Sequence, residues 1–121
     1  MNASEVLPAQ FNVATYFVDR NVAEGRGGSP AFLYEDRTLT YADVQELANR
    51  TGNALRELGV EMETRVLMLC LDAPEFVGAF WGAIKMGANP VPVNTLMRSA
   101  DYLYFLNDSR AKVAVVSAPL L

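Results

Sequence analysis

The chain has 121 residues, of which 51% are hydrophobic and 20% charged, and its formal net charge is -4. A single domain of this size buries roughly two thirds of the surface that its unfolded chain exposes, so we expect one core and no extensive disorder. The acidic balance, with arginines scattered among carboxylates and no basic cluster, disfavours nucleic acid as a partner.

Cysteine and histidine content limits the chemistry that the chain can perform. Histidine is absent, which removes the commonest metal ligand and excludes histidine-dependent nucleophilic triads within this sequence. The lone Cys70 lies in an apolar run, residues 66–71, so a buried and inert thiol is favoured over a reactive one. The N-terminus does not resemble a signal peptide, and the apolar stretches are too short for a membrane span, so we expect a cytoplasmic protein.

The N-terminal quarter predicts a short helix between two irregular segments. Residues 1–11 are expected to be a flexible lead-in. Asn12 is suited to cap a helix over residues 13–23, which Gly25 would end. The glycine-rich residues 25–30 predict a mobile loop.

A β-hairpin and an amphipathic helix are predicted next. Residues 31–34 and 38–40 flank three polar residues, as hairpin strands do. Thr40 and Asp43 form a near capping box, and Gly59 supplies a left-handed stop. Apolar positions recur between them at helical spacing, namely Val44, Leu47, Ala48, Thr51, Leu55 and Leu58.

The second half of the sequence alternates strands and helices. Residues 65–71 predict a strand covered on both faces, and residues 90–93 and 112–116 predict two shorter strands. Between the first two, Asp72 is expected to cap an apolar helix that ends at Gly87. Ser99 is expected to cap the helix between the last two strands.

This order predicts a parallel βαβ crossover. The expected fold class is therefore α/β, with an incomplete flavodoxin-like parallel sheet flanked by helices and a small N-terminal helix and β-hairpin. Because so few strands leave unpaired edges, the isolated chain is expected to be prone to association.

Two turns follow parallel strands, where open α/β sheets bind ligands. The turn at Asp72 and Pro74 suits phosphate poorly because it is acidic, lacks glycine and has lost one amide donor. Asn94 and Thr95 in the next turn are the better candidates for substrate binding, since both can donate hydrogen bonds. The alternative, which we favour, is that they stabilise the turn through their own backbone.

Other clusters give little support for a site. The apolar helix carries three aromatic residues, Phe76, Phe80 and Trp81. Their spacing is that of side chains packed in a core rather than of residues that line a pocket. Three aspartates that could hold a metal ion, Asp72, Asp101 and Asp108, fall on separate caps and turns. No metal site is therefore predicted.

Five segments together carry a family resemblance: residues 11–21 (FNVATYFVDRN), 39–43 (LTYAD), 82–87 (GAIKMG), 91–96 (VPVNTL) and 101–111 (DYLYFLNDSRA). They are similar to the N-terminus of benzoate-CoA ligases, within the acyl-adenylate-forming, AMP-forming acyl-CoA synthetase superfamily. The Asp-Arg-Asn of the first segment and the Asn-Thr-Leu of the fourth favour this branch, because long-chain and cinnamate ligases more often continue that turn with Asn-Pro. On this resemblance, residues 12–121 are the first part of a large N-terminal domain.

The resemblance implies an enzyme that joins benzoate to CoA through an acyl-adenylate, with ATP, Mg²⁺ and CoA as cofactors and AMP and diphosphate as products. The implied partners are the remainder of its N-terminal domain, a C-terminal lid domain and the aromatic carboxylate. The family's Ser/Thr-Ser-Gly-Thr-Thr-Gly phosphate loop, aspartate motif and catalytic lysine have no match here, so no catalytic, cofactor or metal-binding residue is assigned, Lys85 and Lys112 included. The chain alone is expected to be an inactive scaffold.

Two alternatives stay open at this point. The first is another acyl-CoA synthetase or adenylation domain of the same superfamily. The second is a noncatalytic, freestanding α/β binding module.

Overall fold

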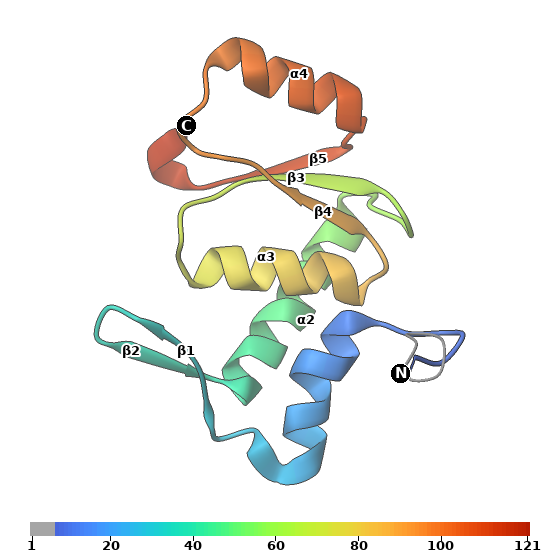
Figure 1. Ribbon diagram of the computed structural model, residues 1–121, viewed down its shortest axis with the longest axis vertical. Coiled ribbons are helices and arrows are strands. Elements are labelled where there is room, and N and C mark those ends of the chain that lie inside the picture. The colour runs from blue at the N-terminus through green and yellow to red at the C-terminus, as the bar shows by residue number, and fades with distance from the viewer. Residues whose placement is uncertain (1–6) are drawn as a thin grey trace.

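The structure is a computed structural model that describes residues 7–121. A three-stranded parallel sheet has helices on both faces, and the N-terminal helix and a β-hairpin pack beside the long helix α2 (Tyr41–Glu57) (Figure 1). The α/β class predicted from the sequence, with an incomplete parallel sheet, is thereby confirmed. Residues 1–6 of the expected lead-in lie outside the described residues, and residues 7–11 are exposed and form neither helix nor strand.

The N-terminal helix begins where the sequence predicts. Asn12 Oδ1 accepts hydrogen bonds from the N–H groups of Ala14 (2.9 Å) and Thr15 (3.4 Å). The helix is wider than predicted, since two segments, η1 (Thr15–Asp19) and η2 (Val22–Arg26), are π-helical. Gly25 adopts φ 85°, which ends the regular helix at the predicted residue.

Polar contacts hold this helix against the two helices beside it. Lys85 Nζ lies 2.9 Å from Asp19 Oδ1, which also accepts a hydrogen bond from Gln45 Nε2 at 2.9 Å. At the other end, Asn12 Nδ2 donates to the carbonyl oxygen of Ile84 (2.8 Å). The three elements therefore converge on one partly buried carboxylate.

The hairpin consists of β1 (Pro30–Tyr34) and β2 (Arg37–Thr40), with Tyr34 paired to Arg37 across a two-residue turn. The turn is one residue shorter than predicted because Glu35 adopts a left-handed φ of 52°. The predicted mobile loop before the hairpin is tied to the next helix, since the N–H of Ala42 donates to the carbonyl of Gly27 (2.9 Å).

Helix α2 (Tyr41–Glu57) begins with the predicted capping box. The Asp43 N–H donates to Thr40 Oγ1 (3.2 Å), and the Thr40 N–H donates to Asp43 Oδ2 (2.8 Å). Gly59, with φ 87°, turns the chain as predicted. Leu58 does not belong to the buried stripe and is 65% exposed, because the helix has already ended at Glu57.

The sheet has the order β4-β3-β5, and both outer strands run parallel to β3. The strands are β3 (Arg65–Leu69), β4 (Asn89–Pro92) and β5 (Val113–Val116), and a 3-10 turn, η3 (Ala118–Leu120), follows β5. Strand β3 ends two residues before the predicted Leu71. The chain leaves the ladder there because the Leu71 N–H donates to the Ser117 side-chain Oγ (2.9 Å).

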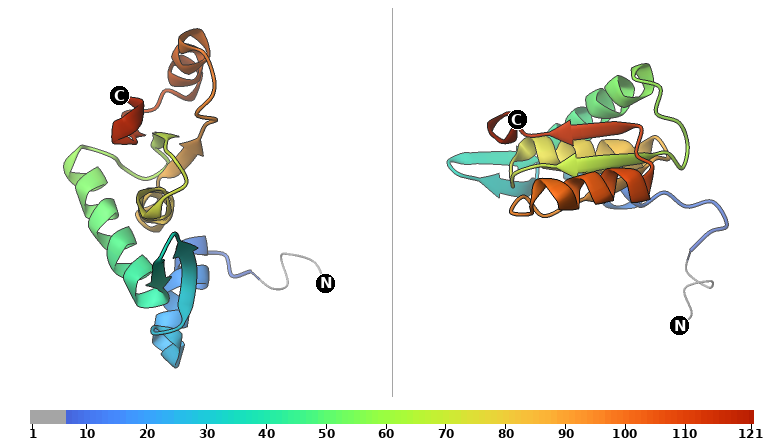
Figure 2. Two further views of the ribbon diagram at one scale, coloured as in Figure 1. Left: turned by 90° about the vertical axis from the view of Figure 1, so that its left-hand side faces the viewer. Right: turned by 90° about the horizontal axis from the view of Figure 1, so that it is seen from above.

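Helices α3 (Pro74–Lys85) and α4 (Ser99–Ser109) lie on opposite faces of this sheet (Figures 1 and 2). The predicted caps were wrong for both. Ala73 precedes α3 in an extended conformation that the following Pro74 enforces, so Asp72 does not cap the helix. Ser99 is already the first residue of α4, and the Asp101 carboxylate accepts the N–H of Arg98 (3.0 Å).

The core is built on small residues where α2 crosses α3. The buried positions of α3 are Pro74, Gly78, Ala79, Gly82 and Ala83, whereas its large aromatic residues are only half-buried. Small side chains allow the two helix backbones to approach closely, which rings at the same positions would prevent.

Candidate ligand site at the carboxyl edge of the sheet

The carboxyl ends of the three parallel strands meet at one edge of the sheet (Figure 1). The chain turns from β3 towards one face to enter α3, and from the neighbouring β4 towards the other face to enter α4. Open α/β sheets bind ligands where adjacent strands diverge in this way. The β3–β4 divergence therefore marks the candidate site, which includes the turn at Asn94 after β4.

The turn after β4 is held by a network of side-chain hydrogen bonds. Asn94 Oδ1 accepts the Leu96 N–H (2.8 Å), which is the turn-stabilising role that the sequence favoured. Tyr102 Oη donates to the Asn94 carbonyl oxygen (2.8 Å) and accepts the Met97 N–H (3.0 Å). Asn94 is exposed and Thr95 is partly exposed. The turn thus presents two polar side chains on a backbone fixed to α4.

Sequence reasoning missed the role of Tyr102. Its position in an apolar helix gave it the pattern of a packing residue, and only the folded turn brings its hydroxyl to Asn94 and Met97. A tyrosine near the start of a helix that follows a polar turn is the one local signal that points to such a contact.

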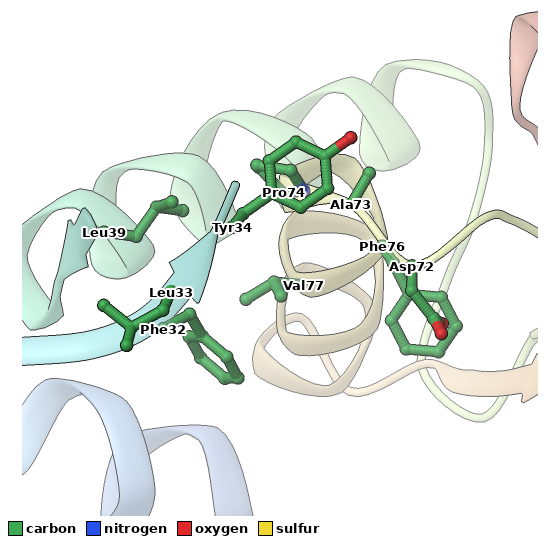
Figure 3. Close-up of a pocket in the computed structure, with 9 residues that line it drawn as sticks. All are labelled: Phe32, Leu33, Tyr34, Leu39, Asp72, Ala73, Pro74, Phe76 and Val77. Atoms are coloured by element: carbon green, nitrogen blue, oxygen red, sulfur yellow. The ribbon is translucent and has the colours of Figure 1, made fainter. Parts of the chain in front are cut away.

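A cavity of about 200 Å³ lies beside the turn after β3, between the hairpin and the start of α3 (Figure 3). Its lining is largely apolar and includes Phe32 and Leu39 from the hairpin and Val77 from α3. Asp72 is the one acidic residue that lines it. The cavity has room for a small apolar group, but no cluster of ionisable side chains to perform chemistry.

The three aromatic residues of α3 do not converge on one pocket. Phe76 lines the cavity of Figure 3, and together with Phe80 it packs against Met68 and Cys70. Trp81 packs instead against the separate cluster around Val18. The prediction that these rings serve core packing is confirmed.

Cys70 is buried, with 5% of its surface exposed, and its Sγ donates to the Val115 carbonyl oxygen (3.5 Å). Burial raises the pKa of this thiol above its ordinary value, which disfavours the thiolate. The predicted inert core thiol is therefore confirmed, and Cys70 is no candidate nucleophile.

Comparison with known proteins decides the family. Residues 19–120 match the family described as AMP-binding enzyme. The chain belongs to the AMP-binding enzymes. It is 44% identical over 111 residues to a 4-hydroxybenzoate--CoA/benzoate--CoA ligase of Rhodopseudomonas palustris, a match that covers 92% of this chain and 21% of that protein. It is 42% identical to a benzoate--CoA ligase of Thauera aromatica, over 95% of this chain and 22% of that protein.

Solved structures of AMP-binding enzymes have the same fold. An anthranilate CoA ligase in complex with anthranoyl-AMP superimposes with a TM-score of 0.91 and 40% identity, over 100% of this chain and 23% of that one. A benzoate CoA ligase from Burkholderia xenovorans LB400 gives 0.85 and 40%, over 92% of this chain and 22% of that one. The resemblance predicted from the sequence is confirmed, and the chain spans about a fifth of the length of these relatives.

The turn at the start of α3 does not fit the phosphates of a nucleotide. At the start of α3, Asp72 is acidic, Pro74 has no N–H, and the Phe76 N–H already donates to the Ala73 carbonyl (3.0 Å). Within residues 7–121, no group of three His, Cys, Asp or Glu side chains could hold a metal ion. Among the same residues, no helix is long and apolar enough to cross a membrane. No chemical step is therefore assigned to this part of the AMP-binding enzyme.

Proposed function

We propose that this chain is the first part of the large N-terminal domain of a cytoplasmic, ATP-dependent and AMP-forming ligase that joins an aromatic carboxylic acid to CoA. The overall reaction would convert benzoate, ATP and CoA to benzoyl-CoA, AMP and diphosphate through an acyl-adenylate, with Mg²⁺ as the metal. The observation that carries the proposal is the 44% identity to the R. palustris ligase over 92% of this chain.

A second candidate function comes from the same family. A long-chain-fatty-acid--CoA ligase of Mycobacterium tuberculosis (strain ATCC 25618 / H37Rv) is 39% identical, but the match covers only 69% of this chain. The aromatic-acid ligases match more of the chain at higher identity, which supports an aromatic substrate. A fatty-acid ligase is therefore the alternative that the assay must separate.

The role proposed for residues 12–121 is structural support, with one contribution to the substrate site. The turn after β4 holds its own backbone through Asn94 Oδ1 and Tyr102, which leaves the Asn94 amide nitrogen and the Thr95 hydroxyl to face a ligand at the carboxyl edge. A carboxylate substrate would accept hydrogen bonds from both. The remainder of the N-terminal domain and a C-terminal lid domain would supply the groups that bind ATP and perform the chemistry.

Substrate preference tests the enzymatic proposal. The protein is recovered with the coding sequence on either side of these 121 codons, and AMP release is measured over a panel of benzoates and fatty acids. Benzoate or a ring-substituted analogue is the expected preference. A clear preference for a fatty acid would select the alternative ligase, and no AMP release with any acid would favour the freestanding binding module. The 121-residue chain alone is expected to show no benzoate-dependent exchange of pyrophosphate into ATP above a buffer control.

Asn94→Asp tests the proposed substrate contact separately. The aspartate keeps an oxygen that can accept the Leu96 N–H, so the turn survives, but it replaces the amide donor with a charge that repels a carboxylate. The expected result is a raised KM for benzoate in the recovered enzyme, with an unchanged melting temperature. Leu96→Ala is the matched control in the same turn, since Leu96 is 90% exposed. An unchanged KM in Asn94→Asp would remove Asn94 from the substrate site.

A further inference from the structure

Strand pairing brings together two cations that are far apart in the sequence. Strands β3 and β5 pair Val66 with Val113, and one residue earlier the Lys112 N–H donates to the Arg65 carbonyl oxygen (3.2 Å). Residues in register on neighbouring parallel strands project from the same face of the sheet. Val66 and Val113 pack in the core cluster of Ala83, on the α3 face. The side chains of Arg65 and Lys112 therefore project from the other face, where α4 lies (Figure 2).

The end of α4 adds a third cation at the same place. Arg110 directly follows α4, and it lines a hollow of about 770 Å³ together with Arg65 and Lys112. Two carboxylates, Glu63 and Asp108, line the same hollow. The hollow lies at the amino-terminal ends of the strands, on the side of the sheet opposite the candidate ligand site (Figure 1).

The backbone around this hollow is strained at two positions. In the described part of the chain, three residues other than glycine have a left-handed φ, and two of them, Glu63 (64°) and Arg110 (54°), line the hollow. Glycine is the usual residue where a helix ends in this conformation, as α4 does at Arg110. Strained backbone is concentrated at functional sites, so its position here favours a binding role for the hollow.

The three cations of the hollow lack carboxylate partners. Among residues 7–121, both ion pairs lie elsewhere, one in the N-terminal helix and one between that helix and α3. The Arg65 guanidinium donates to the backbone carbonyl oxygen of Glu63 (3.3 Å), which leaves its charge unpaired. Like charges side by side on neighbouring strands destabilise a sheet. An anion bound between Arg65 and Lys112 would offset this repulsion.

The charge of the hollow suits a single phosphate group. Its three cations and two carboxylates leave a net side-chain charge of +1. Arginine presents pairs of donors that match the oxygens of phosphate, and lysine adds a point charge. A long polyanion such as nucleic acid would also meet Glu63 and Asp108, which disfavours it.

We propose that this hollow binds the phosphate group of a small molecule through Arg65, Arg110 and Lys112, as a second site separate from the candidate ligand site. The inference goes beyond the proposed function, because it involves neither the ligase reaction nor the residues at the carboxyl edge of the sheet. Free phosphate and a phosphate monoester present the same group to these side chains.

Acetylation of Lys112 by N-hydroxysuccinimidyl acetate, resolved by mass spectrometry, tests the proposal. The 121 residues contain two lysines, so Lys85, which is paired with Asp19, is the internal control. The measurement is made on the 121-residue chain and on the protein recovered with its flanking coding sequence. Inorganic phosphate is expected to slow the acetylation of Lys112 in a saturable way, relative to sodium chloride of equal ionic strength, and to leave the Lys85 rate unchanged.

Two variants test the arginines of the hollow. Arg65→Gln and Arg110→Gln each remove a charged donor, so each should raise the phosphate concentration for half-maximal protection of Lys112 about 10-fold or more. Arg50→Gln is the matched control, because Arg50 is an exposed cation of α2 outside the hollow, and it should leave that concentration unchanged. An unchanged Lys85 rate in each variant would show that the fold is intact.

Ribose 5-phosphate separates the two sources of the phosphate group. Stronger protection of Lys112 by ribose 5-phosphate would identify a phosphate monoester as the ligand, and stronger protection by inorganic phosphate would identify the free ion. Either result upholds the site.

Three outcomes would overturn the inference. The first is equal acetylation of Lys112 in phosphate and in chloride, and the second is protection that is unchanged in both arginine variants. The third is a Lys112 that reacts in the short chain but resists acetylation in the longer protein without phosphate, because the hollow would then be covered. Acetylation requires no activity, so a longer protein that protects Lys112 but releases no AMP would remove the proposed function and uphold the phosphate site.

Discussion

The close approach of α2 and α3 at Gly82 makes the sharpest test of the packing described above. A Cβ atom added at Gly82 would lie 2.8 Å from the carbonyl oxygen of Ala48 and 3.0 Å from the backbone nitrogen of Gly52. Both atoms belong to the backbone of α2, so no side chain can move aside to relieve the contact. Gly82→Ala should therefore push the two helices apart.

The expected size of the effect follows from two opposing terms. Alanine in place of glycine in a helix interior stabilises by about 1 kcal/mol. Overpacking a close contact costs about 1–3 kcal/mol, and the upper end applies where backbone meets backbone. The net expectation for Gly82→Ala is a loss of about 2 kcal/mol in the free energy of unfolding, which lowers the urea midpoint by about 1 M for a slope near 2 kcal/mol per M.

Urea unfolding followed by the fluorescence of Trp81, the one tryptophan of the sequence, measures this loss. Gly28→Ala is the matched control, because a Cβ added at Gly28 meets nothing within 4 Å, and its φ is not positive. The control should leave the midpoint unchanged or raise it slightly. A Gly82→Ala midpoint at or above that of the unmodified chain would refute the close backbone contact between α2 and α3.

Four further predictions follow from individual contacts. Asp19→Asn should lower the free energy of unfolding by about 1 kcal/mol, because it removes the ion pair with Lys85. Added salt should reduce the difference in unfolding free energy between the variant and the unmodified chain, because salt screens the ion pair. Thr40→Ala should cost about 1 kcal/mol through loss of the α2 cap in the same urea assay. Hydrogen bonds from the Thr40 backbone and side chain lower the pKa of the Asp43 carboxyl in the folded chain. The contribution of this carboxylate to folding stability is therefore complete above the ordinary pKa of the carboxyl, and it is lost as the pH falls through the lower pKa of the folded state. In Asp43→Asn, the free energy of unfolding should therefore fall less steeply as the pH is lowered. An unchanged dependence on acidic pH would contradict this. Cys70 should react with a thiol reagent only when urea unfolds the chain, and rapid modification of the native chain would contradict its burial.

The sequence by itself determined the local signals of this protein. Asn12, the Thr40 and Asp43 pair, and Gly59 each act within a few residues of chain, so their capping and stopping roles were predictable and are confirmed. The same holds for the alternation of strands and helices that predicts a parallel sheet. Family membership was also readable, because it depends on the pattern of residues rather than on their contacts.

Tertiary structure alone decided the features that depend on residues far apart in the chain. Leu71 leaves β3 for the side chain of Ser117, 46 residues away, which no local pattern records. Tyr102 reaches back to the turn at Asn94, and small residues rather than aromatic rings fill the crossing of α2 and α3. Only the strand order placed β4, with its prolines Pro90 and Pro92, at the edge of the sheet. These arrangements are set by the packing of whole elements, in which hydrogen-bond partners and close contacts are chosen by the fold and not by the neighbouring residues.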